Sequence, residues 1–107
     1  MKKIKVCSVD EITPGEALQV ELEERPPLAV YNLEGDFYVT DDTCTHGDAS
    51  LAEGDIEGDE IVCPFHLGKF DIRTGEVTAA PCSEPIQTYP VEIEDGTVFA
   101  ILENKHG

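Results

Sequence analysis

Hydrophobic and polar residues alternate along much of this chain. Leu18, Val20 and Leu22, for example, occupy every second position and share one face of the segment 17–22. A period of two is typical of a β-strand with one buried face, and no window keeps the 3.6-residue period of an amphipathic helix. We therefore expect strands at residues 3–9, 17–22, 28–33, 37–40, 61–62, 69–73, 86–93 and 97–102.

Turn sequences separate these expected strands. Glu34-Gly35-Asp36 and Asp95-Gly96 are typical of β-hairpin turns. Pro26-Pro27 is expected to interrupt the sheet, because proline has no amide proton to donate. Between residues 41 and 60 the alternation is lost, and we expect a long loop with a short helical turn near 48–51. A loop of this length in a small domain is usually functional. With about eight to ten short strands, the pattern predicts an all-β sandwich or flattened barrel.

Length and charge narrow the classes of protein and partner. A chain of 107 residues is long enough for one domain with its own core, so we expect a single domain over 1–107. Seven Lys and Arg stand against 23 Asp and Glu, a net charge of -16. This charge disfavours nucleic acid and anionic lipid as partners, and it indicates either docking to basic protein surfaces or solubility alone. No apolar run approaches the roughly 20 residues of a membrane span, and the N-terminus lacks the apolar segment of a signal peptide. We expect a cytoplasmic protein that does not bind membranes.

Two short segments combine one cysteine with one histidine. Cys44 and His46 form the first pair, Cys63 and His66 the second, and sixteen residues separate the pairs. This order, C-x-H and then C-x2-H, is the ligand pattern of a Rieske [2Fe-2S] centre, in which two cysteines bind one iron and two histidines the other. We therefore expect these four residues to bind one [2Fe-2S] cluster, within a cluster-binding part at about 41–85.

A structural zinc site in an interaction module is one alternative, because Zn²⁺ also accepts two cysteines and two histidines. Zinc motifs usually place two cysteines in one half and two histidines in the other, whereas each half is mixed here. The pattern favours iron and sulfide.

The two segments resemble the ligand boxes of the Rieske-type ferredoxins of bacterial aromatic-ring-hydroxylating dioxygenase systems, of the biphenyl, toluene and carbazole type. The matching residues are 44–48 and 63–70, and the resemblance extends nearly end to end through 14–16, 42–47, 73–75 and 81–82. It implies a Rieske-type antiparallel β-sandwich with a small cluster-binding subdomain formed by two loops. It also implies that His46 and His66 face solvent and that 81–85 covers the cluster.

The resemblance implies a soluble one-electron carrier and not an enzyme. Such a carrier takes electrons from a flavoprotein NAD(P)H-dependent ferredoxin reductase and passes them to a terminal oxygenase, and we expect it to be a monomer. A terminal oxygenase itself needs a second iron site of two histidines and a carboxylate, and His106 is the only histidine outside the two boxes. The Rieske-like small subunit of another reductase, such as nitrite reductase, stays open as an alternative.

Respiratory Rieske proteins differ from this chain at three positions of the boxes. Ala49 and Phe65 stand where those proteins have two further cysteines, so the disulfide that bridges their loops cannot form. Gly68 stands where they have a serine that donates a hydrogen bond to a cluster sulfur. Each missing hydrogen bond leaves more negative charge on the cluster, so we expect a potential at the low end of the Rieske range, about -150 mV.

Other residues near the boxes have two interpretations. The acidic residues there form either a recognition ring for basic partners or an ordinary solvated loop; they are Asp41, Asp42, Asp48, Glu53 and Asp55. Cys7 and Cys82 are expected to be small core residues that bind no metal. Lys69 and Arg73 are expected to form ion pairs at strand edges.

Overall fold

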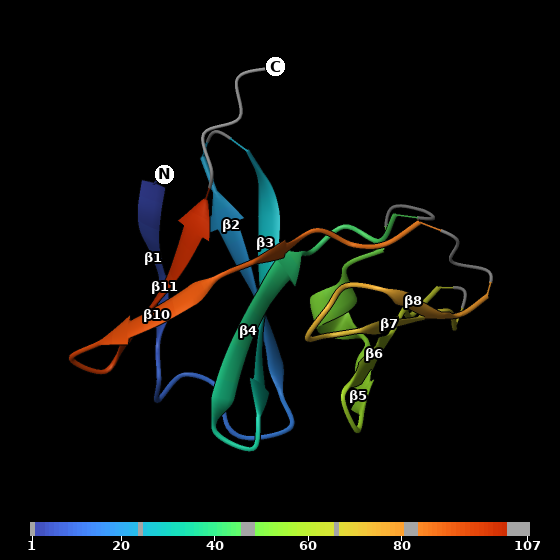
Figure 1. Ribbon diagram of the computed structural model, residues 1–107, viewed down its shortest axis with the longest axis horizontal. Coiled ribbons are helices and arrows are strands. Elements are labelled where there is room, and N and C mark those ends of the chain that lie inside the picture. The colour runs from blue at the N-terminus through green and yellow to red at the C-terminus, as the bar shows by residue number, and fades with distance from the viewer. Residues whose placement is uncertain (1, 24, 46–48, 66, 81–83, 103–107) are drawn as a thin grey trace.

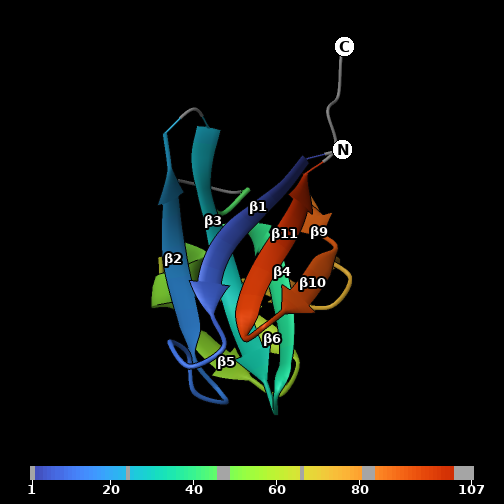
Figure 2. The same cartoon turned by 90° about the vertical axis from the view of Figure 1, so that its left-hand side faces the viewer.

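The computed structural model describes residues 2–23, 25–45, 49–65, 67–80 and 84–102. Within these ranges the chain forms three antiparallel sheets and one short 3-10 helix, which confirms the all-β prediction. Figures 1 and 2 show the sheets as layers, with the N- and C-terminal strands on one side and the sheet of β5 to β8 on the other.

The strands are distributed over the sheets as follows. The first sheet has the order β1 (Lys2–Ser8), β11 (Thr97–Leu102), β10 (Val91–Glu94). The second has the order β2 (Ala17–Leu22), β3 (Arg25–Leu33), β4 (Asp36–Asp41), β9 (Thr88–Tyr89). The third has the order β5 (Asp55–Glu57), β6 (Glu60–Val62), β7 (Lys69–Asp71), β8 (Val77–Ala79), and the 3-10 helix η1 (Leu51–Glu53) precedes it.

Strand β3 lies between two separate hydrophobic cores. Because side chains alternate across a strand, Leu28 and Val30 face one core, and Ala29 and Tyr31 face the other. We call the first the terminal core; its buried members are Val6, Cys7, Ile12, Leu28, Val30, Val39, Val98 and Ala100. We call the second the ligand-side core; its buried members are Ala29, Tyr31, Leu33, Cys44, Ala49, Leu51, Ile61, Cys63, Phe70, Ile72 and Ile86.

Prolines account for two differences from the expected strands. Strand β3 begins at Arg25 and contains Pro26 and Pro27, because the register with β2 shifts there and the ladder with β4 begins only at Leu28. The expected strand 86–93 is divided at Pro90: β9 pairs with β4 in the second sheet, and β10 pairs with β11 in the first. The chain changes sheets at the residue that cannot donate a ladder hydrogen bond.

Short polar strands were missed for a different reason. Strands β5 and β8 have three residues each, and each has a single large apolar side chain, Ile56 or Val77. Three residues are too few for a period of two to be recognised. A helical turn was expected near 48–51; the structure has it about three residues later, as η1 at Leu51–Glu53.

Cys7 is a core residue, as predicted. A register shift between Lys5 and Cys7 in β1 turns both Val6 and Cys7 inward, and Cys7 is 2% exposed. Burial, with a smaller contribution from the negative charge of Glu11, raises the pKa of the Cys7 thiol to about 11.

We expect the free energy of unfolding to fall between pH 8 and pH 10 partly through Cys7. The unfolded thiol loses its proton near pH 8.5, whereas the folded thiol keeps it until about pH 11, so the folded state binds more protons in this window. Urea unfolding of the wild type and of Cys7→Ala at both pH values measures this contribution. The variant should lose less stability on the change to pH 10, and equal losses would contradict the assignment.

Candidate metal centre

The two cysteine and histidine segments form loops of equal length with the same closing hydrogen bond. The N–H of Cys44 donates to the carbonyl of Ala49 at 2.9 Å, and the N–H of Cys63 donates to the carbonyl of Gly68 at 2.8 Å. Each loop therefore spans six residues, from its cysteine to a small buried residue. The two loops therefore have the same length and the same closing hydrogen bond, although their cysteine-to-histidine spacings differ in the sequence.

Regular structure supports both loops. The first follows β4, and the bridge between Thr43 and Ser50 brings its end back into η1. The second joins β6 to β7, and the N–H of Leu67 donates to the carbonyl of Cys63 at 3.0 Å. Gly54 follows η1 so closely packed against β6 that a side chain there would collide with the carbonyl of Val62, the residue before Cys63. The two loops are therefore held beside each other by the third sheet and η1.

The structure places two of the four predicted ligands in the same buried core. Cys44 and Cys63 are 3% and 0% exposed, and both belong to the ligand-side core, whereas Cys7 lies in the terminal core. His46, His66 and Cys82 lie outside the described residues, so the liganding and exposure expected of the histidines, and the core role expected of Cys82, stay predictions.

The donors present suit an iron–sulfur cluster. Two thiols from separate loops lie in one apolar core, and soft sulfur donors are the ligands that such clusters use. His46 follows Cys44 by two residues, and His66 follows Cys63 by three. A chain advances at most about 3.6 Å per residue, so each histidine backbone lies within about 11 Å of its cysteine. A site with two cysteines and two histidines is therefore compatible with these loops.

The segment after residue 80 contacts the first loop where it is described. Thr45 Oγ1 donates a hydrogen bond to the carbonyl of Glu84 at 2.8 Å. Residues 81–83, which carry most of the expected cover over the cluster, lie outside the described ranges.

Neither interpretation of the acidic residues, recognition ring or solvated loop, is right for Asp42. Its side chain is buried, with 1% exposure, because Gln19, Ser50 and Ala52 enclose it with hydrogen bonds. Asp41 is half-buried and accepts hydrogen bonds from Arg25 at 2.8 Å and Tyr89 at 2.6 Å.

The other members of the ring are divided. Glu53 and Asp55 are exposed, and Asp48 lies outside the described residues. No sequence signal separates Asp42 from its acidic neighbours, since its partners come from the returning end of the loop and from β2.

The two cations near the second loop form the expected ion pairs. Lys69 Nζ lies 2.9 Å from Glu57 Oε1, and Arg73 lies 3.5 Å from Asp59 Oδ1. Contact with Glu57, through a hydrogen bond and through its charge, raises the pKa of Lys69. Both pairs lie along the third sheet, so these cations are already matched by carboxylates.

No helical segment within the described ranges has the length and apolar character needed to cross a bilayer.

Comparisons of the sequence and of the structure with known proteins point to the same family. Residues 2–90 match the Rieske [2Fe-2S] domain family. The biphenyl dioxygenase ferredoxin subunit of Pseudomonas sp. (strain KKS102) is 50% identical over 89% of this chain and 87% of its own. The structure of the Sphingomonas yanoikuyae B1 ferredoxin superposes with a TM-score of 0.90 at 49% identity, over 95% of this chain and all of that one.

Two further structures concern the oxygenase partner and the alternative function as the small subunit of a nitrite reductase. The ferredoxin in a complex of reduced oxygenase and oxidized ferredoxin of carbazole 1,9a-dioxygenase superposes with a TM-score of 0.88 at 44% identity, over 92% of this chain and all of that one. A protein described as the small subunit of an NADPH nitrite reductase gives a TM-score of 0.77 at 22% identity, over 95% of this chain and all of that one. At that identity the similarity shows the fold alone.

Proposed function

The chain belongs to the Rieske [2Fe-2S] domain family, and on this premise we propose that Cys44, His46, Cys63 and His66 bind its cluster. Membership gives a Rieske-type [2Fe-2S] cluster as the cofactor, which removes the zinc alternative. The ferredoxin relatives make the chain an electron-transfer component and not an enzyme. One observation carries the ligand assignment: two loops with the same closing hydrogen bond direct Cys44 and Cys63 into one buried core.

We further propose the two exchange partners. The donor is a flavoprotein NAD(P)H-dependent ferredoxin reductase, and the acceptor is the terminal oxygenase of an aromatic-ring-hydroxylating dioxygenase. Relatives that are dioxygenase ferredoxin subunits, and the carbazole complex, support the acceptor. The proposed protein is a cytoplasmic monomer made of one domain, 1–107, with a cluster-binding part at about 41–85.

The residues of the chain have distinct roles in this proposal. When bound, the cluster supplies a one-electron couple between ferric and ferrous iron. Cys44 and Cys63 would hold one iron as thiolates, and His46 and His66 the other. Leu51, Ile61 and Phe70, all fully buried, exclude water from the cysteine side.

The second loop presents apolar side chains to solvent. Phe65 and Leu67, on either side of His66, are 68% and 70% exposed. Leu67 also adopts a φ of 60°, a region that costs a residue with a branched side chain about 1–2 kcal/mol. A strained backbone and an exposed leucine at one position are both unfavourable for folding alone. In our proposal this loop is the face that docks onto the oxygenase.

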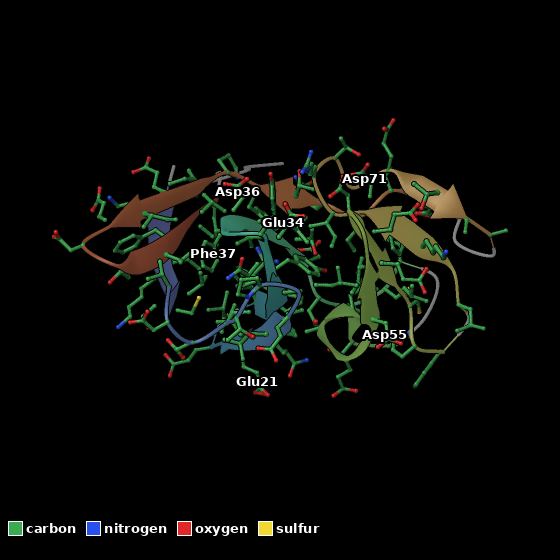
Figure 3. All side chains as sticks on the ribbon, turned by 90° about the horizontal axis from the view of Figure 1, so that it is seen from below. Glu21, Glu34, Asp36, Phe37, Asp55 and Asp71 are labelled. Carbon is green, nitrogen blue, oxygen red and sulfur yellow. The ribbon has the colours of Figure 1, made fainter. Side chains whose placement is uncertain are left out.

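Within the described residues, acidic side chains occur on strands of all three sheets. Figure 3 shows Glu34 and Asp36 near the centre of one side, with Asp55 and Asp71 over the third sheet and Glu21 on the second. Charges distributed in this way attract a basic partner over a distance near the Debye length, about 8–10 Å. Brief encounters of this kind suit a carrier that must leave after each electron.

Reconstitution tests the proposed function. The purified chain should contain iron and acid-labile sulfide, and it should restore NADH-dependent turnover by an aromatic dioxygenase when added to the reductase and oxygenase. A chain with its cluster that fails with several dioxygenase systems, and instead reduces a nitrite reductase, would overturn the assigned partner. A chain without iron and sulfide after anaerobic preparation would overturn the cofactor.

Leu67→Asn is expected to weaken docking and so raise the apparent KM of the oxygenase for the ferredoxin about tenfold. In our proposal Leu67 is buried in the docked complex, and a buried leucine contributes about 1.5–3 kcal/mol. The visible spectrum should be unchanged, and stability should be equal or higher, because asparagine tolerates positive φ. Titration of the oxygenase turnover rate with ferredoxin gives the apparent KM.

Ile93→Thr is the matched control. Ile93 is also exposed and apolar, at 49%, but lies on β10 in the first sheet. Equal increases in KM for both variants would rule out the second loop as the docking face.

A further inference from the structure

Asp42 is a buried carboxylate whose hydrogen-bond donors, among the residues that the structure describes, are all neutral. Gln19 Nε2 donates to Oδ2 at 2.7 Å, and Ser50 Oγ and the N–H of Ala52 each donate to Oδ1 at 2.9 Å. The salt bridges among the described residues involve Lys3, Arg25, Lys69 and Arg73, and none of them includes Asp42. Each of these three groups donates its hydrogen bond to a carboxylate oxygen of Asp42.

These contacts join the two ends of the first loop. Asp42 lies two residues before Cys44, and its side chain reaches Ser50 and Ala52 on the returning end. Its carbonyl also accepts a hydrogen bond from the N–H of Leu51 at 2.7 Å. Gln19 approaches from β2, so the same carboxylate ties the loop to the second sheet.

The charge itself requires an explanation. A buried ion is costly to remove from water, and three neutral donors offset this penalty only in part. An asparagine has nearly the same shape and would accept most of the same hydrogen bonds without that penalty. Closure of the loop therefore accounts for a polar residue at position 42 but not for a negative one.

We propose that Asp42 is a positioning residue of the first loop whose buried negative charge keeps the reduction potential of the cluster low. This inference depends on the proposed function, since it takes Cys44 as a ligand. Two chain steps place the backbone of Asp42 within about 7 Å of that of Cys44. At 1% exposure the charge is poorly screened by water, so it opposes the arrival of a further electron.

Asp42→Asn removes the charge and keeps the shape. At a fixed ambient potential near the midpoint, we expect the ratio of reduced to oxidised protein to rise about tenfold, which is 59 mV for a one-electron couple. Glu53→Gln is the matched control. It also removes one negative charge near the first loop, but Glu53 is the last residue of η1 and its side chain is exposed. Its ratio should change by less than twofold. Equal ratios in the wild type and Asp42→Asn would overturn the proposal.

Asp42→Glu separates charge from position. It keeps the charge but alters the contacts with Ser50 and Ala52, so cluster content should fall while the potential of the loaded fraction stays close to that of the wild type. A shift as large as that of Asp42→Asn would show that geometry, and not charge, sets the potential.

A second route does not alter Asp42 at all. If Asp42→Asn fails to retain the cluster, Gln19→Ala answers the same question, because it lets water reach the carboxylate and should raise the ratio of reduced to oxidised protein. An unchanged ratio there would overturn the proposal. A wild-type protein without iron and sulfide would instead refute the proposed function, so the two failures are distinct.

Discussion

Serine in place of Cys63 is expected to yield a protein without its [2Fe-2S] cluster. A serine hydroxyl stays protonated near neutral pH and is a hard oxygen donor, whereas these clusters are held by soft thiolates. Cys63 is also fully buried in the ligand-side core, so water cannot replace the lost ligand without disrupting that core. Iron and acid-labile sulfide per chain, with the visible spectrum, should fall at least tenfold. Cys44→Ser should behave in the same way, because its loop has the same closing hydrogen bond.

Cys7→Ala is the control for this prediction. Cys7 is as buried as the two proposed ligands but lies in the terminal core, and its raised pKa keeps it a neutral thiol. The variant should lose about 1 kcal/mol of stability from a smaller side chain, and it should keep the full cluster content. Cluster loss equal to that of Cys63→Ser would mean that any buried cysteine substitution unfolds the site, and the ligand assignment would lose its support.

Long alternating strands could be predicted from the sequence because the physics that specifies them is local. The segment 17–22 was expected from its period of two and is found as β2, at Ala17–Leu22. The segment 97–102 was found with the same accuracy as β11, Thr97–Leu102. The division of 86–93 between two sheets is not local, because it depends on which partner strand each half meets.

The ligand chemistry of the candidate site could be predicted from the sequence, but the backbone and side-chain contacts that hold its loops could not. Cysteine and histidine at these spacings point to a mixed-ligand cluster whatever the surrounding fold, so Cys44 and Cys63 could be selected from the sequence as candidate ligands. The equal loop closures at Ala49 and Gly68 depend on backbone geometry and have no signature in side-chain type. Asp42 is the clearest example: its sequence neighbours suggest a solvated loop, but the fold encloses it between Ser50 and Ala52 of the returning loop and Gln19 of β2.

Removal of the cluster is expected to loosen the third sheet and leave the first sheet nearly intact. The binding free energy of a metal site is also folding free energy for the elements that supply its ligands. Both loops of the site lead into or out of elements that pack in the ligand-side core, including η1, β6 and β7. The first sheet packs instead in the terminal core, through Val6, Val98 and Ala100. The two cores share β3, which should therefore show an intermediate effect.

Hydrogen exchange of the full chain with and without its cluster measures this difference. Amides of β6 and β7 should exchange at least tenfold faster after the cluster is removed, because local opening there no longer breaks the bonds to iron. Amides of β1 and β11 should change by less than threefold. The Cys63→Ser protein provides an independent cluster-free sample that has not been exposed to chelator or acid. Uniform acceleration across all three sheets would show that the two cores unfold as one unit, and the ligand-side core would then have no separate stability for the cluster to control.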